Sequence, residues 1–301
     1  KSDGRPIIGL SAETLTGIAL EVNKKSLIIP AHIWTPWFAV LGSKSGFDSI
    51  EECFGKYAKN IYALETGLSS DPYMNWFVSS LDKYTLVSNS DSHSLERIGR
   101  EANVFDLQNF SYDEIYETIK NKDKKKFLYT IEFYPEEGKY HFDGHRACGV
   151  SIDPLTSKKI KICPVCKKEL TFGVLNRVSV LSDRNKEEVE KNKNKFIPYK
   201  HCVGLKEVIG EAINQRSTTK KVDIIYFDII KNVGNEFDVL LNKTEDELRS
   251  LIKNQTIVDA IIRMRKGEMS VIPGYDGEYG IVKIFSDLEK IKNKKVQEKL
   301  F

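Results

Sequence analysis

The stretch Val87-Ser88-Asn89-Ser90-Asp91-Ser92-His93 follows the short apolar run 84–87 and places a carboxylate and an imidazole two residues apart. If the run is a β-strand, both side chains leave its C-terminal end in the same direction, where α/β folds keep their chemistry. An Asp-x-His pair of this kind is typical of a site for a divalent cation. For each side chain alone, a hydrogen-bonded loop residue is the alternative.

Two more apolar runs end in the same way. Residues 27–30 lead to His32, and residues 61–64 lead to Glu65. Neighbouring parallel strands deliver their C-terminal residues to one edge of a sheet. The sequence therefore predicts a metal site at one rim, made by His32, Glu65, Asp91 and His93, and the prediction depends on these side chains meeting around shared cations.

Residues 5–93 alternate four times between strand-like and helical segments, with strands expected at 5–10 and 26–30. This alternation predicts a parallel sheet or barrel with its ligand loops on one face. Ser11 is expected to cap a helix to Val22. The expected buried face of that helix is Leu15, Ile18, Ala19 and Val22.

Two further helix starts are expected before position 93. The pattern Asp48-Ser-Ile-Glu51 predicts a capping box for a helix to about residue 54. Asp71-Pro72 predicts an N-cap and a first-turn proline for a helix over 72–80.

The most specific metal signal is His145-x-x-Cys148 followed by Cys163-Pro-Val-Cys166. Two close pairs of soft ligands can complete a tetrahedral Zn²⁺ site that stabilises a segment too short to form a core. His141 is an alternative to His145 as the fourth ligand. In a chain with five cysteines, an odd number, this spacing favours a metal over disulfides. We expect this zinc to be structural.

Aromatic and basic side chains lie near the expected rim. The two roles considered for the aromatic residues are core packing and stacking on a nucleic-acid base. Those for the arginines are phosphate binding and surface ion pairs. The residues concerned are Trp34, Trp37, Phe38, Arg97 and Arg100, with Arg177 expected beside the zinc segment.

From residue 198 the pattern becomes helical, with apolar residues three and four apart over 205–214, 219–233, 244–254 and 257–266. Gly274, Gly277 and Gly280 precede a strand-like run, not a helix, so a phosphate-binding loop is not expected. The expected domains are 1–135 for the metal domain, 136–186 for a zinc ribbon and 187–301 for a helical domain.

The composition, 41% hydrophobic and 30% charged with a net charge of +3, describes a soluble globular protein. No apolar run approaches the ~20 residues that span a bilayer, so we expect a cytoplasmic protein without a membrane partner. The mild net charge does not by itself mark a nucleic-acid binder.

The chain resembles the endonuclease Q family, DNA repair enzymes built on a PHP (polymerase and histidinol phosphatase) domain. The resemblance covers most of residues 3–285. It rests on the following motifs: Asp3-Gly-Arg-Pro6, Pro30-Ala-His32-Ile-Trp-Thr-Pro36-Trp37-Phe38, Gly46-Phe-Asp48, Glu65-Thr-Gly-Leu-Ser-Ser-Asp71-Pro72, Ser88-Asn-Ser-Asp91-Ser-His93-Ser94, Gly144-His-Arg146-x-Cys148 and Leu170-Thr-Phe-Gly-Val174.

The resemblance implies an α/β fold with a PHP-type distorted (β/α) barrel, a zinc ribbon and a mainly helical C-terminal region. It also implies a metal-dependent endonuclease that cuts DNA on the 5′ side of a deaminated base, such as uracil or hypoxanthine, or of an abasic site. His32, Asp91 and His93 match PHP ligands of a Zn²⁺ or Mn²⁺ cluster, whereas Glu65 matches less well. The opening His-x-His of PHP domains has no counterpart here, so we expect an N-terminally incomplete barrel.

The implied partners are damaged DNA and a replication or repair protein, and the implied location is the nucleoid. Two other functions are considered. The first is a PHP-type phosphoesterase acting on a small phosphomonoester. The second is a DNA-binding module in which only the zinc ribbon is functional.

Overall fold

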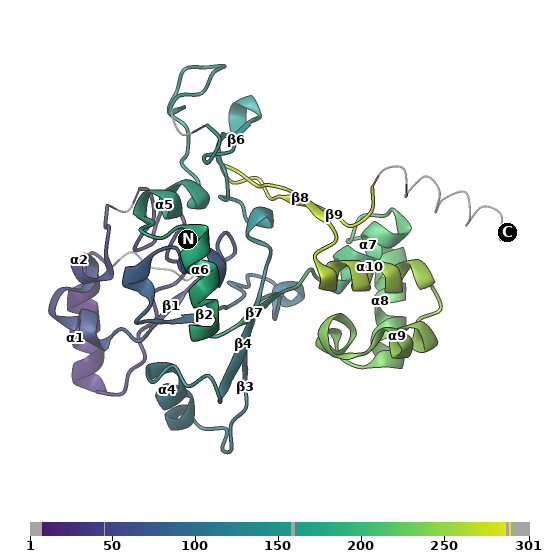
Figure 1. Ribbon diagram of the computed structural model, residues 1–301, viewed down its shortest axis with the longest axis horizontal. Coiled ribbons are helices and arrows are strands. Elements are labelled where there is room, and N and C mark those ends of the chain that lie inside the picture. The colour runs from purple at the N-terminus through teal and green to yellow at the C-terminus, as the bar shows by residue number, and fades with distance from the viewer. Residues whose placement is uncertain (1–7, 45, 158–159, 287–288, 290–301) are drawn as a thin grey trace.

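The computed structural model describes residues 8–44, 46–157, 160–286 and 289 (Figure 1). We refer to three parts, each within the described residues. The body comprises residues 8–142 and 173–203, the arm comprises residues 143–172, and the helical part comprises residues 204–286. Figure 1 shows the arm projecting from one end of the body and the helical part lying beside the body.

The strand ends that were expected to form the rim lie side by side. Strands β1 (Ala63–Glu65) and β2 (Thr85–Val87) are parallel, with Glu65 opposite Val87. Residues 26–30 form no strand, which corrects the prediction. The Pro30 carbonyl nevertheless accepts a hydrogen bond from the Glu65 amide at 3.1 Å, and the Ile33 amide donates to the Glu65 carbonyl at 3.1 Å. The segment that leads to His32 therefore runs along β1.

A second sheet lies below this pair. Strand β4 (Phe127–Glu132) is antiparallel to β3 (Ala102–Phe105) and parallel to β7 (Tyr199–His201). The described residues therefore form an α/β fold with a two-stranded parallel ladder and a three-stranded mixed sheet. Of the parallel sheet or barrel expected over residues 5–93, the described residues form the ladder of β1 and β2. Residues 8–10 of the strand expected at 5–10 are not in a ladder, and residues 5–7 lie outside the described ranges.

The helices of the body begin at polar caps. They are α1 (Ala12–Val22), α2 (Ile50–Phe54), α3 (Pro72–Asn75) and α4 (Tyr112–Lys120). Ser11 and Asp71 accept hydrogen bonds from the third helical amides of α1 and α3, as predicted. The cap of α2 is Ser49 and not Asp48, and α3 ends at Asn75, well before residue 80.

The predicted buried face of α1 is wrong. Leu15 and Ile18 are each 47% exposed and Val22 is 84% exposed, whereas Thr16 and Gly17 are buried. Gly17 lies against the ring of Tyr57, so the helix packs on the body through its small residues. The spacing of Leu15, Ile18 and Val22 shows that α1 has an apolar face. It does not show that other described residues pack against that face.

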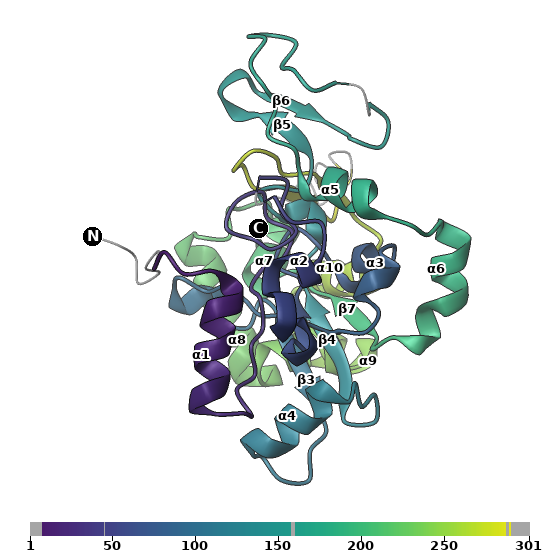
Figure 2. The same ribbon diagram turned by 90° about the vertical axis from the view of Figure 1, so that its left-hand side faces the viewer.

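The arm contains the hairpin β5 (Asp143–His145) and β6 (Val150–Ile152), and the chain returns from it to the body through α5 (Val174–Leu181) and α6 (Lys186–Asn192). Figure 2 shows the arm at the end of the molecule opposite α4. Short 3-10 turns lie at Gly55–Asn60, Ser79–Leu81, Leu95–Arg97, Pro135–Glu137, Arg146–Cys148 and Lys193–Lys195.

The helical part packs α7 (Leu205–Ile213), α8 (Lys220–Val233), α9 (Glu245–Leu251) and α10 (Gln255–Lys266) around one apolar core, with a π-helical turn at Asp238–Asn242. These helices agree with the predicted segments within a few residues. None of the helices in the described ranges has the length and hydropathy of a membrane span.

A final hairpin, β8 (Ser270–Ile272) and β9 (Ile281–Lys283), joins the helical part to the body near the base of the arm (Figure 1). Its glycine-rich turn packs directly on backbone: the Gly274 amide donates to the Glu136 carbonyl at 2.7 Å, and the Gly280 amide donates to the Glu137 carbonyl at 3.0 Å. A Cβ at Gly274 or Gly280 would lie 2.3 or 2.2 Å from a carbonyl oxygen. Glycine is therefore required here by close backbone packing.

Candidate functional site

The carboxylate of Glu65 connects the loops that follow the strand ends. Glu65 is 8% exposed; its Oε2 accepts a hydrogen bond from the His32 amide at 2.6 Å, and its Oε1 accepts one from Nδ2 of Asn89 at 2.9 Å. We call residues 30–43 and 88–100 the rim loops. Glu65 thus holds the His32 loop and the loop of the Asp-x-His motif at the same edge, as the sequence predicted.

The ligand atoms of the four predicted rim residues do not come together as a group. Asp91 and His93 are exposed, and Nδ1 of His93 lies 2.9 Å from the carbonyl oxygen of its own neighbour, Asp91. Outside residues 1–7, 45, 158–159, 287–288 and 290–301, only one group of three or more His, Cys, Asp or Glu side chains is close enough to hold an ion, and it lies in the arm. The rim residues described therefore do not form a metal site by themselves.

The rim loops do carry unusual backbone. His32, Phe38 and Asp91 have φ angles of +34°, +56° and +44°, in the left-handed region that residues other than glycine rarely adopt. Strain of this kind costs on the order of 1–3 kcal/mol and concentrates at functional sites. The other four described non-glycine residues with positive φ lie in or next to turns: Lys122, Lys167, Asn214 and Asp276.

A buried carboxyl group that the sequence analysis missed lies below the rim. Glu132, at the end of β4, is 0% exposed and accepts hydrogen bonds from the hydroxyls of Thr66 at 3.0 Å and Thr130 at 2.5 Å. Burial raises the pKa of Glu132 to about 7, and the charge of Asp71 adds to this effect. Because Thr66 also donates its amide to the Val87 carbonyl at 3.0 Å, Glu132 supports both strand ends.

A second pair that the sequence analysis missed lies beside Glu132. Nε2 of His201 is 2.9 Å from Oδ2 of Asp71, and the ring of Tyr134 stacks on His201 with the centroids 4.4 Å apart. Burial alone would lower the pKa of His201, but the hydrogen bond to Asp71 and its charge raise it above the ordinary value. The sequence signal for Glu132 was an acidic residue closing an apolar strand, whereas His201 had no signal.

The three aromatic residues considered for stacking on a base differ in their exposure to solvent. Trp34 is 1% exposed and donates from Nε1 to Oδ1 of buried Asn75 at 2.8 Å, so it is a core residue and cannot stack on a base in this conformation. Trp37 is 42% exposed and packs edge-on against Tyr140, with the centroids 5.7 Å apart. Phe38 is 85% exposed.

The arginines are engaged within the protein. Arg97 lies 3.6 Å from Glu207 of α7, which supports the ion-pair alternative. Arg100 donates from Nε to the Ser90 carbonyl at 2.9 Å and so holds the second rim loop.

Arg177 corrects a prediction. Its side chain, 14% exposed, donates to the carbonyls of Leu41 and Phe47 at 2.8 and 2.7 Å and to the Asp48 carboxylate at 2.5 Å. All three acceptors belong to the protein, so Arg177 is a structural residue and does not present its guanidinium to a phosphate.

The arm brings its four predicted ligands together. One ligand atom from each of His145, Cys148, Cys163 and Cys166 lies within 4.8 Å of the others. The Cys166 sulfur is 3.7 Å from Nδ1 of His145, close to the roughly 3.6 Å between a sulfur and a nitrogen ligand of tetrahedral zinc. The donor set and the distances therefore fit a Zn²⁺ ion.

His141 is not part of this group. It is 4% exposed, and its Nδ1 lies 3.4 Å from the Ser69 carbonyl oxygen in the body. Of the two candidates for the fourth ligand, the geometry favours His145.

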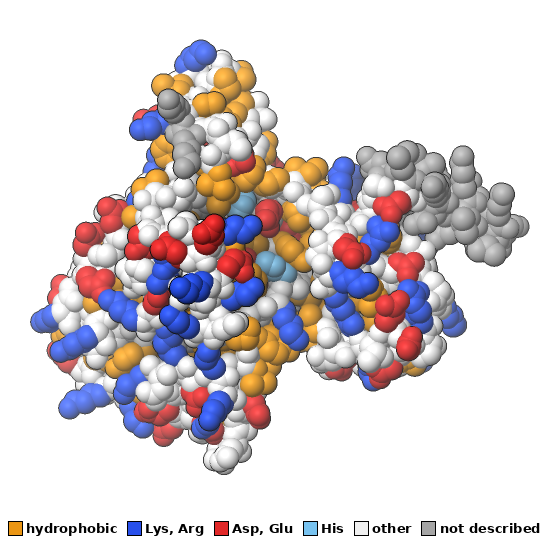
Figure 3. Space-filling view, in the orientation of Figure 1, with side chains coloured by type: hydrophobic (Ala, Val, Ile, Leu, Met, Phe, Trp, Pro, Cys, Tyr) orange, Lys and Arg blue, Asp and Glu red, His pale blue; other side chains and the backbone are white. Residues whose placement is uncertain are grey.

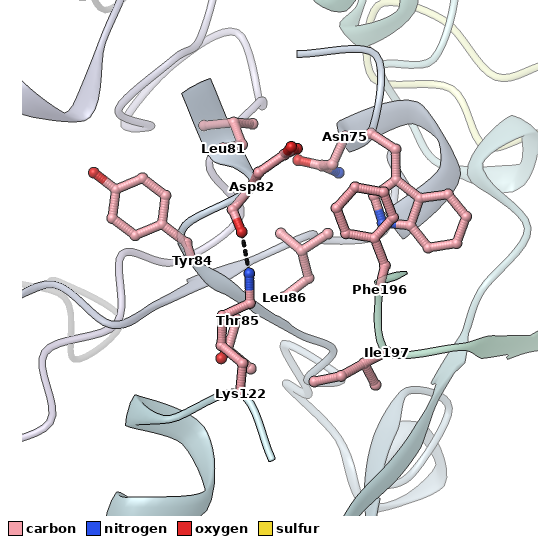
Figure 4. Close-up of a pocket in the computed structure, with 10 residues that line it drawn as sticks. Asn75, Leu81, Asp82, Tyr84, Thr85, Leu86, Lys122, Phe196 and Ile197 are labelled. Carbon is pink, nitrogen blue, oxygen red and sulfur yellow. Dashed lines mark hydrogen bonds between the residues drawn. The ribbon is translucent and has the colours of Figure 1, made fainter. Parts of the chain in front are cut away.

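A small cavity of about 20 Å³ lies between β2 and the chain before β7. Figure 4 shows Lys122 reaching the backbone oxygen of Asp82 at its edge, with Phe196 and Ile197 on the other side. Burial lowers the pKa of Lys122. The cavity has room for about one water molecule, so it is a packing defect and not a substrate site.

Comparisons with known proteins agree with this architecture. Residues 83–123 match the family described as PHP-associated, and residues 204–268 match the family described as MJ0043 C-terminal domain. The chain is 33% identical over 288 residues to the uncharacterized protein MJ0043 of Methanocaldococcus jannaschii, covering 91% of this chain and 35% of that protein. It is 31% identical over 281 residues to the uncharacterized protein YqxK of Bacillus subtilis, covering 92% of this chain and 67% of that protein.

Two crystal structures are also similar. One is the lesion-specific endonuclease PfuEndoQ from Pyrococcus furiosus, with a TM-score of 0.80 and 27% identity over 99% of this chain and 72% of that chain. The other is endonuclease Q in complex with a 27-mer duplex that has an abasic lesion at the active site, with a TM-score of 0.80 and 27% identity over 95% of this chain and 69% of that chain. The chain spans about a third of the length of the Methanocaldococcus relative and two thirds of the Bacillus relative.

Proposed function

This chain belongs to the endonuclease Q-like family of PHP proteins, together with Bacillus subtilis YqxK, and from that membership we propose that it cuts the DNA backbone beside a damaged nucleotide. The observation that carries the proposal is the TM-score of 0.80 to a lesion-specific endonuclease over 99% of the chain. The proposed substrates are an abasic site and the deaminated bases uracil and hypoxanthine, with cleavage on the 5′ side.

We assign the rim loops as the reacting edge. Asp91 and His93 are exposed there and would act on the scissile phosphodiester as members of a larger set of metal ligands. The expected Zn²⁺ or Mn²⁺ cluster would need ligands beyond His32, Glu65, Asp91 and His93. Several buried side chains below this edge hold it in position, since Glu65 fixes both loops and Thr66 with Glu132 fixes the strands beneath them.

The arm supports the proposal in a different way. Its His145, Cys148, Cys163 and Cys166 would hold Zn²⁺, and a closed site with four protein ligands contributes folding free energy and has no open position for a substrate. We therefore assign the arm a structural role in presenting a DNA-binding surface.

DNA would run along the hollow between the body and the helical part. Figure 3 shows this hollow, with both basic and acidic side chains on its sides and hydrophobic side chains within it. Binding through phosphates should weaken steeply as salt rises. A cytoplasmic, nucleoid-associated location and a repair-protein partner remain part of the proposal.

One observation favours a second function. Because no three of the described rim side chains bring their ligand atoms within 4.8 Å of one another, this part of the chain would also suit a DNA-binding module whose zinc arm and helical part bind damaged DNA without cutting it. A phosphoesterase acting on a small phosphomonoester is the third candidate, and it leaves the arm and the helical part without a role.

A nicking assay separates these functions. Labelled duplexes containing one abasic analogue, uracil or hypoxanthine are incubated with the protein and Mn²⁺ or Zn²⁺, and a chromogenic phosphomonoester is tested in parallel. The endonuclease proposal expects nicking 5′ to the lesion, whereas binding without nicking supports the module. Turnover of the monoester alone would support the phosphoesterase.

Asp91→Asn tests the site itself. It should reduce nicking on the order of 100-fold or more, because a carboxylate ligand of the expected metal cluster is lost, while the affinity for DNA changes by less than about twofold. Asp106→Asn, at another exposed aspartate outside the rim loops, is the matched control. Normal nicking by Asp91→Asn would remove Asp91 from the active site.

A further inference from the structure

Phe38 combines two properties that cost free energy. Its phenyl ring is 85% exposed, although a ring of this size is normally buried or half buried. Its backbone has a φ of +56°, a conformation that a bulky side chain adopts only when the surrounding structure forces it. An exposed and strained aromatic residue gains nothing from packing within its own chain, so a binding role is the physical explanation of this outlier.

The loop around Phe38 is closed at its base by backbone hydrogen bonds. The Leu41 amide donates to the Ile33 carbonyl at 2.8 Å, and both side chains are buried at 1% and 0% exposure. The Lys44 amide donates to the Pro36 carbonyl at 2.9 Å, which closes the loop a second time. Phe38 therefore projects from a loop whose base is fixed in the core.

The same loop is fixed to the rim. It begins at His32, whose amide is bound by the Glu65 carboxylate, and Oγ1 of Thr35 donates to the Trp37 carbonyl at 3.1 Å, directly before Phe38. The ring of Trp37 is held edge-on by Tyr140, whereas no ring contact is found for Phe38 within the described residues. Of the two exposed aromatic residues, Phe38 is the one free to enter another molecule.

We propose that Phe38 is a wedge that enters the base stack of duplex DNA at the lesion and fills the place of the extruded nucleotide. The inference rests on the proposed function. It adds the residue that stabilises the DNA once the damaged nucleotide has left the base stack. Removing a nucleotide from the stack costs a few kcal/mol. Apolar side chains, phenylalanine among them, offset such a cost in other DNA-distorting proteins by inserting between base steps.

The test uses a duplex with a tetrahydrofuran abasic analogue next to 2-aminopurine, whose fluorescence rises when it leaves the stack, and an intact duplex of the same sequence. The wild-type chain should raise the fluorescence of the lesion duplex. Phe38→Ala should abolish most of that rise and weaken binding to the lesion duplex by about 5- to 100-fold, the range of base–aromatic stacking. Phe38→Trp should retain both. Phe110→Ala, at a phenylalanine that is 96% exposed beside α4, is the matched control and should behave as wild type.

Phe38→Gly gives an independent readout. Glycine adopts positive φ without strain, so this variant should have a higher midpoint of thermal unfolding than wild type while losing the fluorescence response. If Phe38→Ala and Phe38→Gly keep the response and the preference for the lesion duplex, the wedge is refuted and the proposed function stands. If wild type shows no preference for the lesion duplex, both are refuted.

Discussion

Glu132→Gln tests whether the buried carboxyl group below the rim titrates in the neutral range. Glu132 is 0% exposed, and its pKa is raised from 4.5 to about 7 because the charged form loses its solvation. The folded chain therefore binds this proton more tightly than the unfolded chain does. The resulting stability is fully present below about pH 4.5 and is lost as the pH rises to about 7.

The magnitude follows from the size of this change. At about 1.4 kcal/mol for each pH unit, the ionised carboxylate makes folding less favourable by about 3 kcal/mol above pH 7 than it is below pH 4.5. Glutamine has nearly the same shape and can still accept from Thr66 or Thr130, but it does not ionise. Its spare amide protons add a cost of about 1 kcal/mol that does not depend on pH.

The assay is urea unfolding of wild type and Glu132→Gln at several pH values from 5 to 8.5. The free energy of unfolding of the variant, relative to wild type, should rise by about 2–3 kcal/mol between pH 5 and pH 8. The buried groups Glu137 and Glu207 also have raised pKa values because of burial, but they are present in both proteins and largely cancel in the difference. Glu101 cancels less completely, because the charge of Glu132 is one cause of its raised pKa. A difference that does not change with pH would show that Glu132 does not titrate in this range.

Two further predictions concern the arm and Arg177. Cys163→Ala should release zinc and leave residues 143–172 open to limited proteolysis, because the metal supplies the folding free energy of this segment; a variant that keeps its zinc would show that another ligand set holds it. Arg177→Ala should lower the free energy of unfolding by about 3 kcal/mol, because carbonyls of Leu41 and Phe47 lose their donor, with little change in DNA affinity. A large loss of affinity without loss of stability would return Arg177 to the DNA-binding surface.

Short-range chemistry was predictable from the sequence. The ligand spacing of His145, Cys148, Cys163 and Cys166 places four donors together whatever the rest of the fold does, and the structure confirms the group. Helix starts behaved similarly, because a cap depends on a side chain and an amide three residues on. The α2 start moved by one residue, since Ser49 and Asp48 are both good caps and only packing chooses between them.

Long-range geometry was not predictable in the same way. The apolar runs before Glu65 and Asp91 indicated two strand ends at one edge, which the parallel pairing of β1 and β2 confirms, but no pattern in the sequence specifies where four side chains point. Trp34 illustrates the limit, because a tryptophan in a polar-flanked loop became core once Asn75 provided a buried acceptor. The Glu132 network joins residues of the chain that are 66 positions apart, so it has no local signature.

The glycine-rich turn that joins the final hairpin to the base of the arm has a consequence for dissecting this protein into pieces. A truncation after Lys266 would keep four helices but leave the carbonyls of Glu136 and Glu137 without the amides of Gly274 and Gly280. The arm, which the truncated chain retains with every cysteine, would then lose part of its support. Shortened variants should accordingly be made by deletion from the N-terminus. If a C-terminal deletion loses zinc, the cause is the loss of the amides of Gly274 and Gly280 and not a change in the zinc ligands.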